Sequence, residues 1–148
     1  MSDKPNVWAR RKARRALVQA VYQWQMSGTG YSAICQEFEA SPALKKADVD
    51  HFRTVLREVL TGAGELDAHY SPHLDRSVQQ LDVVERSVLR LATAEFEHHI
   101  EVPYRVVIDE YVELTKVFGA EESHKYVNGV LDKLAGTLRS LEVGARRG

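Results

Sequence analysis

The side chains of this chain best suited to chemistry are basic, and they lie near its start. Five of the six positions from 10 to 15 are cations: Arg10, Arg11, Lys12, Arg14 and Arg15. The stretch that follows, Ala16 to Trp24, has the spacing of an amphipathic helix, so we expect the cations on its first turns. Cations at the start of a helix oppose the helix dipole, and a bound polyanion would offset them. We interpret them as a nucleic-acid contact; the alternative is an ordinary solvated helix end.

The helical repeat divides this segment into two faces. One face should be an apolar stripe of Ala13, Leu17, Ala20 and Trp24. Near the opposite side we expect Arg11, Arg15, Val18 and Tyr22. The segment is therefore predicted to pack on one side and to present charge on the other.

A second candidate stretch runs from Phe118 to Lys133. If Val127, Val130, Leu131 and Leu134 point inward, then Tyr126, Gly129 and Lys133 share one flank and Lys125 points outward. Glycine inside a helix costs about 1 kcal/mol relative to alanine, so Gly129 calls for a reason. One reason is close helix packing, and the other is a bare patch where an RNA base lies on the Tyr126 ring and Lys133 meets a phosphate. The alternative for Tyr126 itself is a half-buried core aromatic.

Residues for catalysis or metal binding do not gather in the sequence. His69 and His73 have helical spacing, but Pro72 separates them, and His98 and His99 lack nearby partner ligands. No glycine-rich phosphate loop is present. Cys35 is the single cysteine, which we expect to be buried in a reduced protein. We predict a binding protein without enzymatic activity, metal or cofactor.

Charge is unevenly distributed along the 148 residues. Residues 1–15 hold six basic residues and one acid, which leaves 14 basic and 20 acidic residues, a net charge of −6, for the rest. An acidic body with a basic arm can bind nucleic acid at the arm and a basic protein elsewhere. No apolar run has the length of a membrane span or a signal peptide, so we expect a cytoplasmic protein with no membrane association.

The periodicity throughout is helical, and we expect an all-α fold of about seven helices. Ser27 to Gly30 should end the first helix, Ser41-Pro42 the second, and Gly62 or Gly64 the third. Asp82 and Glu85 have the spacing of a capping box that opens the next helix. We expect helices over 106–117, ended by Gly119, and from about 123 to 141, then a loose tail over 144–148. The chain should form a single domain, with an N-terminal subdomain over about 8–75 and a C-terminal one over about 76–142.

Three stretches together resemble the NusB family of bacterial transcription antitermination factors. They are Phe118 to Lys133, Arg10 to Gln25, and Val102-Pro103-Tyr104. The resemblance covers nearly the whole chain and implies an all-helical fold of two three-helix bundles. It also implies binding to the boxA element of ribosomal RNA leaders, as a heterodimer with the ribosomal protein NusE. That complex helps RNA polymerase to read through terminators.

The resemblance also implies roles for particular residues. The RNA-binding residues are expected to be Arg10, Arg11, Lys12, Arg14, Arg15, Tyr22, His73 and Tyr126, with Lys125 and Lys133 beside Tyr126. Tyr126 stands where a phenylalanine is familiar in the family, and His73 where a tyrosine can occur. Glu85, in the acidic half, is expected to contact NusE. Residues 1–8 and the tail from Gly144 have no counterpart in the family pattern.

Three alternatives accompany this interpretation. A NusB-like helical module can serve an RNA methyltransferase, which would here be a separate polypeptide. The chain could instead be a structural adaptor whose basic arm only improves solubility, and RNA binding distinguishes that class. The free protein is also a candidate for homodimerisation through the surface that later meets a partner.

Overall fold

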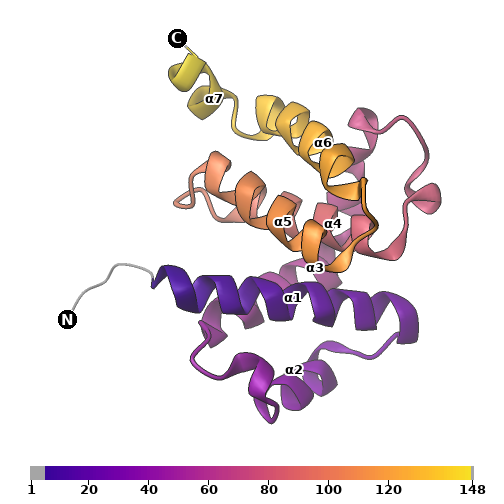
Figure 1. The fold of residues 1–148 in the computed structure, drawn as a ribbon, viewed down its shortest axis with the longest axis vertical. Coiled ribbons are helices and arrows are strands. Elements are labelled where there is room, and N and C mark those ends of the chain that lie inside the picture. Colours follow the sequence, from indigo (N-terminus) through magenta and orange to yellow (C-terminus); the bar gives the residue numbers. More distant parts are fainter. Residues whose placement is uncertain (1–5, 148) are drawn as a thin grey trace.

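The computed structural model describes residues 6–147, which fold into seven α-helices and three short 3-10 turns, with no strand in that range (Figure 1). The helices are α1 (Val7–Ser27), α2 (Tyr31–Glu39), α3 (Val49–Tyr70), α4 (Val83–His98), α5 (Tyr104–Phe118), α6 (Ser123–Leu138) and α7 (Ser140–Arg147). The 3-10 turns are η1 (Pro42–Leu44), η2 (Ser71–His73) and η3 (Val78–Gln80). The all-α expectation is confirmed.

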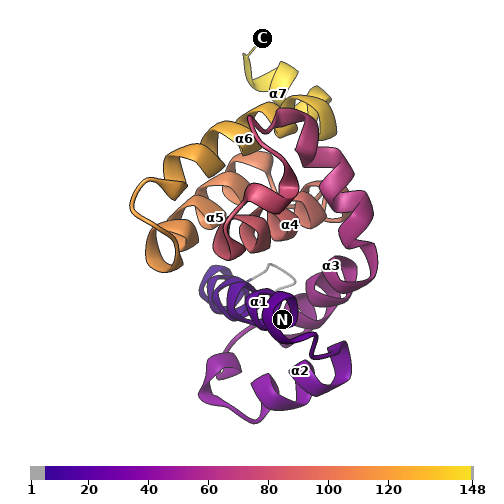
Figure 2. The same ribbon diagram turned by 90° about the vertical axis from the view of Figure 1, so that its right-hand side faces the viewer.

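The helices are arranged around α4. Figures 1 and 2 show α1 and α2 at one end of the molecule, α5, α6 and α7 toward the other, and α3 extending along both groups. Helix α4 packs against α1, α3, α5 and α6. Nearly all residues of α4 from Ser87 to Phe96 are buried, as expected for a helix enclosed on all sides. The two groups of helices therefore share one core, and the subdomain boundary near residues 75–82 stays a prediction.

Local sequence signals place several helix ends correctly. The Asp82 carboxylate accepts from the Glu85 backbone N–H at 2.8 Å, and Glu85 Oε1 accepts from the Asp82 N–H at 3.2 Å, which confirms the capping box. Helix α1 ends at Ser27 and is capped by Gly28, whose φ of +75° suits a residue without a Cβ atom. Helix α2 ends just before Ser41-Pro42.

Three expected boundaries are wrong, and one of them is the end of α6, which lies at Leu138 rather than at about residue 141. Helix α3 does not stop at Gly62 or Gly64; Gly62 only kinks it, with φ −120° and ψ 17°. The helix continues because Leu66 and Tyr70 are buried in the core, and this packing outweighs the glycine penalty. The tail from residue 144 is not loose within the described range, because α7 continues to residue 147.

A buried arginine accounts for the break between α6 and α7. The Arg139 guanidinium donates to the carbonyl oxygens of Glu95, Phe96 and His99 at 2.8 to 3.2 Å, and to the Val102 carbonyl at 2.9 Å. The Phe96 carbonyl belongs to the last turn of α4, where carbonyls run out of helical partners, and the guanidinium places a positive charge at the negative end of the α4 dipole. The sequence pattern did not reveal this contact, because Arg139 lies about forty residues beyond α4.

Candidate nucleic-acid interface

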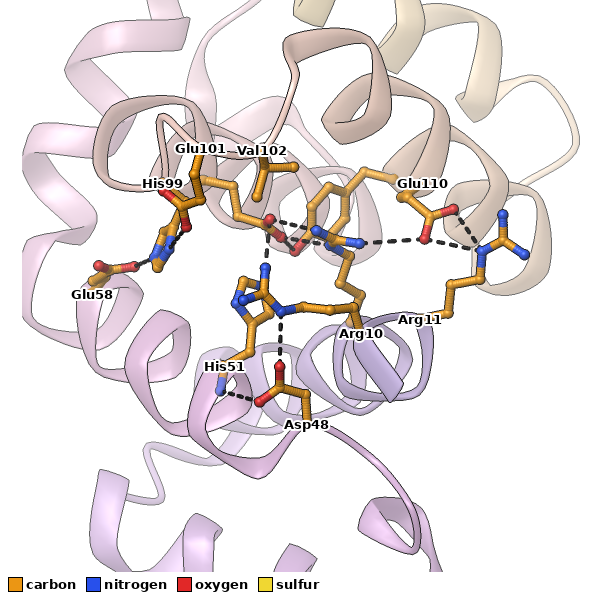
Figure 3. A network of polar contacts seen from close by, with 12 residues as sticks. Arg10, Arg11, Asp48, His51, Glu58, His99, Glu101, Val102 and Glu110 are labelled. Atoms are coloured by element: carbon orange, nitrogen blue, oxygen red, sulfur yellow. Dashed lines mark hydrogen bonds and ion pairs between the residues drawn. The ribbon is translucent and has the colours of Figure 1, made fainter. Parts of the chain in front are cut away.

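The cations at the start of α1 have different surroundings. Arg10 Nε donates to Asp48 at 2.9 Å, and Arg11 Nε donates to both oxygens of Glu110 at 3.1 and 3.2 Å (Figure 3). No carboxylate of residues 6–147 lies within 4 Å of the cationic groups of Lys12 or Arg15. The Arg15 guanidinium lies instead over the Phe118 ring, 5.3 Å from its centre. Lys12 and Arg15 are therefore the cations of this helix whose charge no described carboxylate neutralises, so they are the best placed to bind an anionic ligand.

Arg14 is buried, with 3% of its surface exposed, and forms an ion pair inside the protein. Its Nε and Nη2 atoms each donate to one oxygen of Glu95 at 2.9 Å, and Nη1 donates to Glu110 at 3.3 Å. Arg14 is thus part of the core in this structure, and its RNA contact stays a prediction. Its partner Glu95 lies 81 residues away in α4, so no local pattern revealed the pair. The prediction that Val18 lies near the charged side of the first helix is wrong, because Val18 is buried.

Glu95 is the centre of this buried network. Tyr111 Oη and Arg14 both donate to it, and His51 Nε2 lies 3.4 Å from its Oε1 atom. Burial alone would raise the pKa of Glu95, but His51 and Arg14 beside it hold that pKa well below its ordinary value. The carboxylate is therefore charged at neutral pH and keeps Arg14 in place.

The network extends to the surface through histidines (Figure 3). The His51 ring lies edge-on to His99, with centres 5.3 Å apart, and His99 Nε2 lies 2.7 Å from a Glu58 oxygen. The Glu58 carboxylate raises the pKa of His99 above the ordinary 6.5. Together these contacts join α1 to α3, α4 and α5, and they set the direction in which Lys12 and Arg15 point.

A second exposed patch lies on α6. Tyr126 is half-buried, and its hydroxyl donates to Asp75 at 3.0 Å. Gly129 is exposed, and a Cβ atom built on it would meet nothing within 4 Å, so close helix packing is not the reason for this glycine. Lys133 is exposed with no described carboxylate within 4 Å, whereas Lys125 is paired with Glu122 at 2.9 Å. The bare flank expected beside Tyr126 is thus present.

The two patches are connected by the turn between α5 and α6. Phe118, under Arg15, ends α5, and Tyr126 follows at the end of the first turn of α6. The Lys12 and Arg15 side also continues across a groove to η1, where Lys45 and Pro42 form the opposite wall. Lys45 was not among the predicted site residues, because a single lysine in a loop carries no distinguishing pattern.

The remaining predicted site residues lie in different settings. Tyr22 is exposed near the far end of α1, and His73 is half-buried in η2, two residues before Asp75. Glu85 is only 7% exposed, and its Oε2 atom accepts from Ser123 Oγ at 2.9 Å. Its carboxylate fastens the start of α4 to the start of α6, so Glu85 is not the open charge that we expected for a partner contact.

Two other findings bear on the class of protein. Within residues 6–147, no group of three or more metal-ligating side chains converges. No helix of the same range combines the length and apolar character needed to cross a membrane.

Comparison with known proteins identifies the family. Residues 11–136 match the model of the NusB family. The chain belongs to the NusB family. It is 51% identical to the transcription antitermination protein NusB of Alcanivorax borkumensis over 99% of this chain and 98% of that protein. Identity to the NusB of Pseudoalteromonas atlantica is also 51%, over 91% and 96% of the two chains.

Solved NusB structures have the same fold. A crystal form of NusB from T. maritima superposes with a TM-score of 0.77 and 34% identity, over 92% of this chain and 94% of that one. A crystal structure of the antitermination factors NusB and NusE with double-stranded RNA superposes with a TM-score of 0.77 and 26% identity, over 87% and 97%. The NusB resemblance is confirmed, and the protein is a transcription antitermination factor rather than an enzyme.

Replacing Arg14 with alanine should strongly destabilise the fold, because Glu95 would remain as a buried charge without its main partner. Breaking one side of a buried ion pair costs about 3 to 5 kcal/mol. The matched exposed cation is Lys12, and Lys12→Ala should change the free energy of unfolding by less than about 0.5 kcal/mol. Urea unfolding followed by circular dichroism measures both. Similar small losses for the two variants would contradict a structural role for Arg14.

The His99 and Glu58 pair should make stability depend on pH. Because the folded-state pKa of His99 is raised, the pair stabilises the protein below pH 6.5, and this contribution is lost as pH rises through the raised pKa. Relative to wild type, His99→Gln should lower Tm more at about pH 6 than at about pH 9. His98→Gln, at the exposed neighbouring histidine, serves as the control. If the Tm difference between His99→Gln and wild type does not change with pH, the His99 and Glu58 pair is not the cause of that difference.

Proposed function

We propose that this protein binds boxA RNA of ribosomal RNA leaders as a heterodimer with NusE. In this proposal the heterodimer joins RNA polymerase in an antitermination complex that reads through terminators, which places the protein in the cytoplasm. The observation that supports it best is the pair of exposed cations Lys12 and Arg15, with the half-buried rings of Phe118, under Arg15, and of Tyr126 farther along the chain. The solved NusB, NusE and RNA complex with the same fold is consistent with it.

The RNA backbone is proposed to follow the cations that have no carboxylate partner among residues 6–147. Lys12 and Arg15 on α1, with Lys45 across the groove, can approach phosphates without first breaking an ion pair with any carboxylate that the structure describes. Arg10 and Arg11 must exchange Asp48 and Glu110 for phosphate, so they should contribute less. Phosphate contacts of this kind supply affinity and its salt dependence rather than sequence choice.

NusE, which is basic in this family, is proposed to dock on the acidic half of the chain. Residues 85–122 contain nine acids and four bases, a net charge of −5. The acids of this range whose side chains are exposed are Glu101, Asp109, Glu113, Glu121 and Glu122. Exposed charges at an interface mainly steer association, so these residues should set the association rate with NusE. Glu85 would act indirectly, by holding α4 and α6 together under that surface.

The proposal is tested by fluorescence anisotropy with labelled boxA RNA and a scrambled RNA of equal length, with and without NusE. We expect preference for boxA, strengthened by NusE, and a salt dependence measured between about 50 and 200 mM. Lys12→Ala and Arg15→Ala should each flatten the log-log salt slope by about 0.7, the value for one single-strand phosphate contact.

Arg105→Ala is the matched control, because Arg105 is a partly exposed cation on α5 paired with Asp132. Equal binding of boxA and scrambled RNA in the presence of NusE would refute the proposed function. If Lys12→Ala and Arg15→Ala leave the log-log salt slope unchanged, the RNA phosphates do not contact these two residues. Sedimentation of the free protein at several concentrations tests the homodimer expected above.

Tyr126→Ala should weaken boxA binding, because the ring offers a surface on which a base can stack. Stacking of this kind is worth about 1 to 3 kcal/mol, a loss of about five- to more than one-hundred-fold in affinity. Thermal unfolding of the same variant separates this role from core packing. Lost stability with intact RNA affinity would exclude Tyr126 from the site.

The neighbouring glycine provides the complementary variant. Gly129→Ala fits open space and should stabilise α6 by up to about 1 kcal/mol, while its methyl group crowds a base lying beside Tyr126. Higher stability with weaker RNA binding is the expected pair of results.

A further inference from the structure

A cluster of the exposed Asp75 and Arg76 with the half-buried Tyr126 covers part of the proposed stacking site. The Arg76 guanidinium lies over the Tyr126 ring, 4.3 Å from its centre. Asp75 and Arg76 belong to the segment between η2 and η3, whereas Tyr126 belongs to α6. The cluster therefore joins two segments that lie about fifty residues apart in the sequence.

One carboxylate holds both other members of the cluster. Arg76 Nε donates to Asp75 Oδ1 at 2.6 Å, and its Nη2 donates to Oδ2 at 3.3 Å. The Tyr126 hydroxyl donates to the same Oδ1 atom at 3.0 Å. The hydrogen bonds from Arg76 and Tyr126 lower the pKa of Asp75 below its ordinary value, so the carboxylate is charged at neutral pH.

This arrangement works against RNA binding in two ways. A base that stacks on the ring must share it with the guanidinium or displace it. The carboxylate also occupies the donors of Arg76 that a phosphate would use in the same two-pronged geometry. Because Asp75 and Arg76 are both exposed, their pair is weak and a phosphate can replace it.

We propose that Asp75 is an internal competitor for RNA, which holds Arg76 across the Tyr126 ring in the free protein and releases it to a phosphate when a base stacks there. Arg76 is thus a further RNA-binding residue, and Asp75 is a residue that lowers affinity and positions Arg76. The inference rests on the proposed function, because it names an additional contact of the same RNA site.

The test uses anisotropy with boxA RNA on the full chain. Asp75→Asn keeps an oxygen that can accept from Tyr126 but removes the charge that holds Arg76, and it should tighten binding by about two- to five-fold, the range of a weak surface ion pair. Asp50→Asn, at an exposed aspartate in the first turn of α3, is the control for the same change in net charge. Arg76→Gln should weaken binding and flatten the salt slope by about 0.7.

The double variant shows whether Asp75 acts through Arg76. The gain from Asp75→Asn should disappear when it is combined with Arg76→Gln. Equal effects of Asp75→Asn and Asp50→Asn, or a gain that persists without Arg76, would overturn the inference while leaving the proposed function intact. Failure of the wild-type protein to prefer boxA in the presence of NusE would instead refute the proposed function.

Discussion

The buried ion pair between Arg14 and Glu95 joins the first helix to the central one, and the position of the other α1 cations depends on it. Neither charge could remain in the core without the other, because an unpaired buried charge costs several kcal/mol. Glu110 and Tyr111 of α5 complete the contacts of this pair. Three helices distant in sequence are therefore held in one geometry by a single polar centre.

The cations of α1 have two roles: some hold the helix against the rest of the protein, and others are available to bind a ligand. Arg10, Arg11 and Arg14 each meet a carboxylate from α5, α4 or the residue before α3, whereas Lys12 and Arg15 meet none among residues 6–147. The paired arginines hold the helix backbone in place, so Lys12 and Arg15 start from fixed positions on the surface. The basic start of the chain is thus part of the body of the protein and part of its binding surface.

The acidic residues of the rest of the chain also have two roles, one inside the fold and one at the surface. Glu95 and Glu85 are buried and hold helices together, whereas Asp75 is exposed beside the aromatic patch. A carboxylate that pairs with an arginine near an RNA site holds that arginine in place in the free protein. The same pairing reduces the affinity for RNA, because a phosphate must compete with the carboxylate. For a protein with both an RNA and a basic protein as proposed partners, the position of each acid matters more than the net charge.

The sequence by itself determined the helical class, the family and most helix starts. These features depend on neighbours within a few residues, such as the capping box of Asp82 and Glu85 or the proline at position 42. Only the tertiary structure decided which cations are free, because the partners Asp48, Glu95 and Glu110 lie 38 to 99 residues away from the arginines they bind. It likewise decided that α3 continues past Gly62, since burial of Leu66 and Tyr70 against other helices outweighs a local preference.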